Sequence, residues 1–132
     1  MDAKAKLLLV DDEPLVRRSL QKTLIRAGFE VETASNCTEG LSTFETAQSS
    51  GTCFDLAVLD LNMPSFDGTY ATGAGLDLLS QLMKQRSDIP VVVLTAYDEV
   101  GKAKDAVNCG ARSYFVKGRE QGLVALINEI LA

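Results

Sequence analysis

Five polar residues each stand at the end of a short apolar run in this sequence: Asp11, Asp12, Asp60, Thr95 and Lys117. If the fold gathers them, three carboxylates lie beside a hydroxyl and an ammonium group. Carboxylates within a few ångströms of one another repel, and a cation is needed to offset their charge. The chain has no histidine, and a set of oxygen ligands suits Mg²⁺, for which Mn²⁺ can substitute. The residue types therefore indicate a divalent-metal site built from carboxylates.

A metal ion and Lys117 together would neutralise the oxygens of a phosphoryl group, which is most of what phosphoryl transfer requires of a protein. A carboxylate that stays free to attack phosphorus would then be the nucleophile. Asp60 is the best candidate for this role, because it ends an almost wholly apolar run, where an unpartnered carboxylate is costly. The expected chemistry is transfer of a phosphoryl group to Asp60.

Short apolar runs alternate along the chain with segments of helical periodicity. The runs predict strands over residues 6–10, 29–34, 54–61, 91–96 and 113–117. Helices are predicted over 14–27, from Asn36 to a break at 49–51, around Leu76 to Met83, from an Asp98 cap to Gly110, and over 120–130. The polar, glycine-rich stretch 65–75 is expected to be a loop.

Strand and helix alternation of this kind predicts an α/β fold, with a doubly wound five-stranded parallel sheet and helices on both faces. With the flavodoxin-like strand order 2-1-3-4-5, the first and third strands are neighbours. Ligands of such sheets bind beyond the carboxyl ends of the strands, where the strand order reverses. In that order Asp60 lies between Asp11 and Asp12 on one side and Thr95 and Lys117 on the other.

Composition indicates one cytoplasmic domain spanning residues 1–132. A net charge of −5 leaves no basic stripe for direct nucleic-acid or membrane-surface binding, and no run approaches the length of a membrane span. Cys37, Cys53 and Cys109 are widely spaced and odd in number, which suits neither a disulfide framework nor a zinc site. We expect all three to be small buried residues in a reducing compartment.

Four motifs of this chain resemble the signature motifs of bacterial response-regulator receiver domains. They are L-L-V-D-D-E-P at 8–14, D-L-N-M-P at 60–64, V-L-T-A at 93–96 and Y-F-V-K at 114–117. They follow the family's order at the family's strand ends, and the resemblance covers essentially the whole chain. It implies a phosphoacceptor domain of a two-component system. The domain would not be an enzyme for other substrates, and would catalyse only its own phosphorylation and slow dephosphorylation.

The resemblance also implies roles for individual residues at the metal. Asp60 matches the phosphoacceptor, Asp12 a direct metal ligand, and Asp11 a residue that acts mostly through a metal-bound water. Asn62 matches the position that offers its main-chain carbonyl to the metal. The expected metal site therefore comprises Asp11, Asp12, Asp60 and Asn62.

The same resemblance implies a switch and partners. Thr95 matches the hydroxyl that turns toward the phosphoryl oxygens, Lys117 their ion-pair partner, and Tyr114 the aromatic side chain that moves inward with Thr95. A sensor histidine kinase or a phosphotransfer protein would donate the phosphoryl group. The face made by the fourth helix, the fifth strand and the last helix is where dimerisation or target docking is expected.

Two departures from the family pattern bear on this site. Gly118 stands where receivers usually have proline after the lysine, so we expect a trans Lys117–Gly118 bond, a positive φ at Gly118, and a lysine that still reaches Asp60. Residues 69–74 read as an insertion before the third helix, close to the phosphorylation site, where they could alter the access of partners.

Three other functions are compatible with parts of this pattern. A phosphohydrolase of the haloacid-dehalogenase type also uses an aspartate nucleophile with Mg²⁺, but it needs a second aspartate where this chain has Asn62. A flavodoxin would place phosphate in the loop after the first strand, where Asp11 and Asp12 would repel it. A phosphorylation-independent, receiver-like interaction module is the remaining alternative, although such chains generally lose an acidic or switch residue and none is missing here.

Overall fold

Five parallel strands form one sheet in the computed structural model, which describes residues 4–96, 99–118 and 120–132. Their order is β2-β1-β3-β6-β7, which is the predicted order 2-1-3-4-5 of the five main strands. The strands are β1 Lys6–Val10, β2 Glu30–Ala34, β3 Leu56–Asp60, β6 Val91–Thr95 and β7 Ser113–Val116. Every residue of β3 and β6 is buried, as continuous apolar runs predict for parallel strands covered on both faces.

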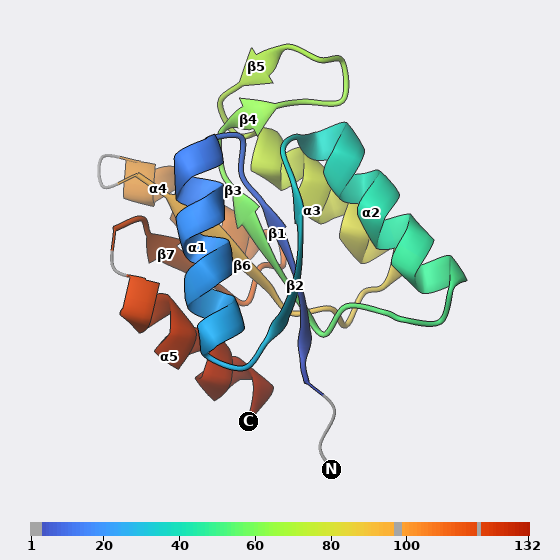
Figure 1. The fold of residues 1–132 in the computed structure, drawn as a ribbon. Helices are drawn as coiled ribbons and strands as arrows, with labels where there is room; N and C mark the ends of the chain where they lie inside the picture. The colour runs from blue at the N-terminus through green and yellow to red at the C-terminus, as the bar shows by residue number, and fades with distance from the viewer. Residues whose placement is uncertain (1–3, 97–98, 119) are drawn as a thin grey trace.

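Helices cover both faces of this sheet, so the predicted doubly wound architecture is confirmed (Figure 1). The helices are α1 Pro14–Arg26, α2 Cys37–Ser49, α3 Ala74–Gln85, α4 Val100–Asn108 and α5 Glu120–Leu131. Helices α1 and α5 pack on one face, and α2, α3 and α4 pack on the other. Because side chains alternate along a strand, β1 sends Leu7 and Leu9 to the first core and Leu8 and Val10 to the second.

Local signals set where the helices begin and end. Asn36 caps α2 by accepting a hydrogen bond from the backbone N–H of Glu39 at 2.8 Å, as predicted. Pro14 occupies the first position of α1, where its missing N–H costs nothing. The N-terminus of α5 is tied to α1, since Ser19 and Thr23 both donate hydroxyl hydrogen bonds to the Glu120 carboxylate. The Asp98 cap predicted for α4 lies outside the described residues.

The stretch 65–75 is more ordered than the predicted loop. It contains part of a two-stranded antiparallel hairpin, β4 Met63–Pro64 with β5 Tyr70–Ala71, and α3 begins inside it at Ala74. Strands of two residues are too short for an alternating pattern to reveal, so the prediction of a plain loop was wrong here. The hairpin stands beyond the carboxyl end of β3 (Figure 1).

Two glycines near the site meet different requirements. Gly75 at the start of α3 lies so close to β3 that a Cβ on it would sit 2.3 Å from the Asp60 carbonyl oxygen, so α3 is held directly against the end of that strand. Gly118 has φ of 110° and follows a trans peptide bond, which confirms both expectations for this position. A Cβ at Gly118 would meet no atom within 4 Å, so glycine is needed there for its backbone conformation and not for space.

The prediction that all three cysteines are buried was wrong for two of them. Cys37 is buried, and burial raises the pKa of its thiol to about 11, with the charge of Asp77 adding to the effect. Cys53 and Cys109 are exposed, because they lie in the connections after α2 and α4, and connections run over the surface. Within the described part of the chain, no helix is long and apolar enough to cross a membrane.

Candidate functional site

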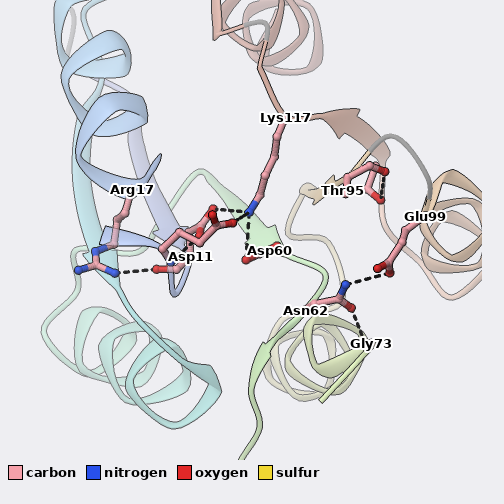
Figure 2. A network of polar contacts seen from close by, with 10 residues as sticks. Asp11, Arg17, Asp60, Asn62, Gly73, Thr95, Glu99 and Lys117 are labelled. Carbon is pink, nitrogen blue, oxygen red and sulfur yellow. Dashed lines mark hydrogen bonds and ion pairs between the residues drawn. The ribbon is translucent and has the colours of Figure 1, made fainter. Parts of the chain in front are cut away.

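The carboxyl ends of the parallel strands bring the predicted residues to one edge of the sheet. Asp11 follows β1, Asp60 ends β3, Thr95 ends β6 and Lys117 follows β7 (Figure 2). A backbone hydrogen bond of 2.9 Å from Lys117 to the Thr95 carbonyl holds the last two strands in register at this edge. Asp11, Asp60 and Thr95 are buried polar residues in an otherwise apolar interior. The structure therefore gathers the polar strand ends as the sequence predicted.

Lys117 is the central cation of this cluster. Its Nζ lies 3.1 Å from Asp11 Oδ2, 3.2 Å from Asp60 Oδ2 and 2.8 Å from Glu13 Oε1. The expectation that Lys117 still reaches Asp60 despite Gly118 is confirmed. The contact with Glu13 was not predicted, because an exposed glutamate at a helix start has an ordinary explanation as a solvated residue.

Asp11 is held in place from three directions. Its carbonyl oxygen accepts a hydrogen bond from Arg17 at 2.8 Å, and its Oδ1 accepts the backbone N–H of Glu13 at 2.9 Å (Figure 2). Its Oδ2 is buried and accepts no hydrogen bond of good geometry, although Lys117 is close enough to form an ion pair. Buried oxygens without a hydrogen-bond partner are rare and call for an explanation such as a missing ion or water.

Four acidic residues form a group that fits a hard divalent cation. Asp11, Asp12, Glu13 and Asp60 each offer a carboxylate oxygen, and these atoms lie within 4.8 Å of one another. All donors are oxygens, and the Oδ2 of Asp11 lacks a hydrogen bond, so the donor set fits Mg²⁺ or Mn²⁺. Glu13 joins the three aspartates predicted from the sequence.

The site perturbs the titration of two of its members. Burial raises the pKa of Asp60 to about 8, and the negative charge of Asp11 adds to this while Lys117 opposes it. The pKa of Lys117 is raised because its hydrogen bond to Glu13 and the charges of Asp60 and Asp11 outweigh the opposing effect of its own burial. Without a metal ion, the positive charge of Lys117 therefore does not fully offset the negative charge of the buried carboxylates.

Asn62 forms a polar bridge that the sequence did not reveal. Its side-chain amide donates to Glu99 Oε2 at 2.8 Å, and its Oδ1 accepts the backbone N–H of Gly73 at 2.9 Å (Figure 2). The bridge ties the segment after Asp60 to the starts of α3 and α4. Glu99 was missed because 37 residues separate it from Asn62 and no motif links them.

Thr95 and Tyr114, the two residues of the predicted switch, lie on the neighbouring strands β6 and β7. The Thr95 side chain is buried, and its hydroxyl donates to the carbonyl of Ala96 at 3.1 Å, so it is turned to its own backbone (Figure 2). Tyr114, on the neighbouring strand β7, is half-buried and packs against the core shared by α2, α3 and α4.

Comparison with known proteins agrees with this geometry. The family model described as the response regulator receiver domain matches residues 7–128. The chain belongs to this family. The receiver domain is also similar to a solved receiver-domain structure from Clostridium thermocellum, with a TM-score of 0.80 and 30% identity over 96% of this chain and 94% of the other.

Curated relatives of this receiver domain are longer proteins. It is 40% identical to the probable transcriptional regulator ycf27 of Pyropia yezoensis over 86% of this chain and 42% of the relative. It is 34% identical to the regulatory protein AtoC of Escherichia coli over 89% of this chain and 23% of that protein. The receiver domain thus spans less than half the length of the curated relatives that it matches.

Proposed function

We propose that this receiver domain accepts a phosphoryl group on Asp60, with Mg²⁺ or Mn²⁺ held by the neighbouring carboxylates. The observation that carries the proposal is the position of Asp60, buried at the end of β3 and 3.2 Å from Lys117 Nζ, within the acidic cluster. A carboxylate so placed is a nucleophile with a cation beside it to bind the oxygens of an incoming phosphoryl group.

Each residue of the site has its own role in this proposal. Asp60 supplies the attacking oxygen, Lys117 binds a phosphoryl oxygen, and the Thr95 hydroxyl leaves the Ala96 carbonyl to bind another. Arg17 and the helix start at Glu13 keep Asp11 in position at the acidic cluster. The domain catalyses its own phosphorylation and slow dephosphorylation, and turns over no other substrate.

Asp12, Asp60 and the main-chain carbonyl of Asn62 are the proposed direct ligands of the metal, with Asp11 acting mainly through bound water. When bound, the metal neutralises charge on the carboxylates and on the phosphoryl oxygens. The bridge from Asn62 to Glu99 and Gly73 supports this arrangement, because it holds the Asn62 backbone in place without using its carbonyl. The Asn62 side chain also argues against a phosphohydrolase function, because an amide cannot act as the general acid or base that such an enzyme needs at this position.

We predict that acetyl phosphate modifies this protein only when Mg²⁺ or Mn²⁺ is present. Without a cation, the carboxylates repel an anionic donor and burial keeps Asp60 largely protonated at neutral pH. Intact-protein mass spectrometry should show one added phosphoryl group with metal and none with a chelator. Equal modification with and without the chelator would contradict the metal assignment.

A histidine kinase or a phosphotransfer protein is the proposed physiological donor. The exposed Leu15 at the start of α1 and a groove of about 460 Å³ beside Lys117, lined in part by Val16 and Phe115, offer apolar surface to such a partner. The face of α4, β7 and α5 is the proposed site of a homodimer or of target docking. We propose that residues 1–132 act as one cytoplasmic domain that binds neither nucleic acid nor a membrane.

Phosphorylation is expected to move Thr95 and Tyr114 together. The phosphoryl group offers the Thr95 hydroxyl a charged acceptor in place of the Ala96 carbonyl, and a contact made in one state only shifts the population toward that state. Addition of beryllofluoride, which mimics the phosphoryl group, should shift NMR signals of β7 and α4 as well as those around Asp60. Thr95→Val should keep the shifts around Asp60 and lose those of β7. Shifts confined to the Asp60 loops in the parent protein would support a phosphorylation-independent interaction module instead.

A further inference from the structure

Glu13 stands between β1 and α1, and its backbone is fixed beside the acidic cluster. Its N–H donates to Asp11 Oδ1 at 2.9 Å, and its carbonyl oxygen accepts the N–H of Arg17 at 2.9 Å. It occupies the N-cap position of α1, where a side chain commonly accepts a backbone N–H of the first turn. Among residues 4–96, 99–118 and 120–132, Glu13 makes no such capping bond, and its carboxylate contacts Lys117 instead. The side chain is therefore directed to the site and not to the helix.

The contact with Glu13 is the shortest of the three ion pairs that Lys117 forms with residues that the structure describes. Nζ lies 2.8 Å from Glu13 Oε1, compared with 3.1 Å from Asp11 Oδ2 and 3.2 Å from Asp60 Oδ2. The Glu13 contact also has the geometry of a hydrogen bond, in which the ammonium group donates. An ammonium group has three N–H donors. In the unphosphorylated protein, Lys117 therefore has as many acidic partners as it has N–H groups.

The three acidic partners of Lys117 differ in how easily they can move. The side chains of Asp11 and Asp60 are 0% and 6% exposed, so the protein interior holds both in place. The side chain of Glu13 is 58% exposed and has a longer stem. Glu13 and Lys117 both line the groove of about 460 Å³, which gives the Glu13 carboxylate space to turn away from the ammonium group. Of the three contacts, the one with Glu13 costs least to open, because exposed ion pairs contribute little to stability.

A phosphoryl group at Asp60 competes with Glu13 for the same ammonium group. In the proposed function Lys117 binds a phosphoryl oxygen, whose negative charge attracts the ammonium group and repels a neighbouring carboxylate. Asp60 carries the phosphoryl group and Asp11 is fixed in the interior, so Glu13 is the partner that is able to leave. A contact that exists only in the unphosphorylated state shifts the population toward that state.

We propose that Glu13 restrains Lys117 in the unphosphorylated protein and releases it when a phosphoryl group binds. Glu13 is then a positioning residue, which opposes the phosphorylated state by holding Lys117 away from the phosphoryl oxygens. The inference rests on the proposed phosphorylation of Asp60. It separates Glu13 from the proposed metal ligands, because a metal ligand favours the phosphorylated state through the metal and a restraint on Lys117 opposes that state.

Beryllofluoride binding tests this restraint without any transfer of a phosphoryl group. Its dissociation constant is measured on the whole chain by NMR titration at saturating Mg²⁺, for the parent and for Glu13→Gln, Glu13→Asp and Glu30→Gln. Glu13→Gln removes the charge, and Glu13→Asp keeps the charge on a side chain that is one methylene shorter, so both weaken the hold on Lys117. Each should tighten beryllofluoride binding by roughly 1.5-fold to 5-fold, the range that an exposed ion pair supplies. Glu30→Gln makes the same change in net charge at the exposed start of β2, and should keep the parent affinity.

The pattern across the variants separates a restraint from a charge effect and from metal binding. If both Glu13 variants leave beryllofluoride binding unchanged or weaken it, the inference is overturned while the proposed function stands. If Glu13→Gln alone tightens binding, the charge matters without the contact to Lys117, and the restraint is overturned. The Mg²⁺ affinity is measured separately, and a loss of roughly tenfold or more in both variants would make Glu13 a metal ligand and overturn the restraint as well. Failure of the parent to bind beryllofluoride with Mg²⁺ would count against the proposed function, and this inference would fall with it.

Discussion

Replacing Asp60 by asparagine should abolish the phosphoryl adduct completely. The amide has nearly the shape of the carboxylate but cannot supply an attacking oxygen that carries negative charge. Asp60 is buried 3.2 Å from Lys117 Nζ, and in the proposed function it alone supplies the attacking oxygen. Mass spectrometry after incubation with acetyl phosphate and Mg²⁺ should find only unmodified protein.

A matched control uses an aspartate at the other end of the sheet. Asp88 lies before β6, is exposed and forms an ion pair with Arg86, so Asp88→Asn should be modified at the rate of the parent. Peptide mapping of the parent adduct should place the phosphoryl group on the peptide that contains Asp60. Persistent modification of Asp60→Asn would reassign the acceptor to another carboxylate of the cluster.

In the absence of metal, the free energy of unfolding should decrease as pH rises from about 4 to about 8. Asp60 has a pKa of about 8 in the folded protein and an ordinary value of 3.8. Between these values the folded state holds a proton that the unfolded state has released, so each rise in pH favours unfolding. The contribution of Asp60 to stability is greatest below its ordinary pKa of 3.8 and is lost progressively up to the folded pKa of about 8. Since a pKa change of one corresponds to about 1.4 kcal/mol, the loss is on the order of several kcal/mol.

The shifted pKa values of Asp67 and Lys117 do not change the expected loss of stability between pH 4 and pH 8. The pKa of Asp67 is lowered to about 2, so its favourable contribution is lost only when the pH falls below its ordinary value of 3.8. The pKa of Lys117 is raised, so its contribution is complete below 10.5 and is lost only at higher pH. Asp60 therefore dominates the slope between pH 4 and pH 8.

Urea unfolding at several pH values in a chelator tests this slope. Asp60→Asn has no carboxyl to titrate, so its stability should vary much less over the same range and exceed that of the parent at pH 8. Mg²⁺ should stabilise the parent more at pH 8 than at pH 5, because the cation binds the ionised site of the folded state. A parent protein whose stability is flat or rises between pH 4 and pH 8 would contradict the destabilising burial of Asp60.

Much of the fold and site follows from local features of the sequence. Continuous apolar runs mark strands buried on both faces, and the helical segments between them imply parallel pairing. Parallel pairing places Asp11, Asp60, Thr95 and Lys117 at one edge of the sheet, and the flavodoxin-like strand order was adopted for that sheet and is confirmed. The absence of proline after Lys117 predicted the trans Lys117–Gly118 peptide bond and the positive φ of Gly118. These features are readable because burial periodicity and backbone preference belong to each segment by itself.

Other features were decided only in three dimensions. The pairing of Glu13 with Lys117 and the bridge from Asn62 to Glu99 join residues that are 104 and 37 positions apart. The exposure of Cys53 and Cys109 depends on where connections run, and the hairpin that carries Tyr70 consists of two-residue strands. A side chain chooses its partner by distance and desolvation in the folded protein, and neither quantity is encoded in the spacing of residues along the chain.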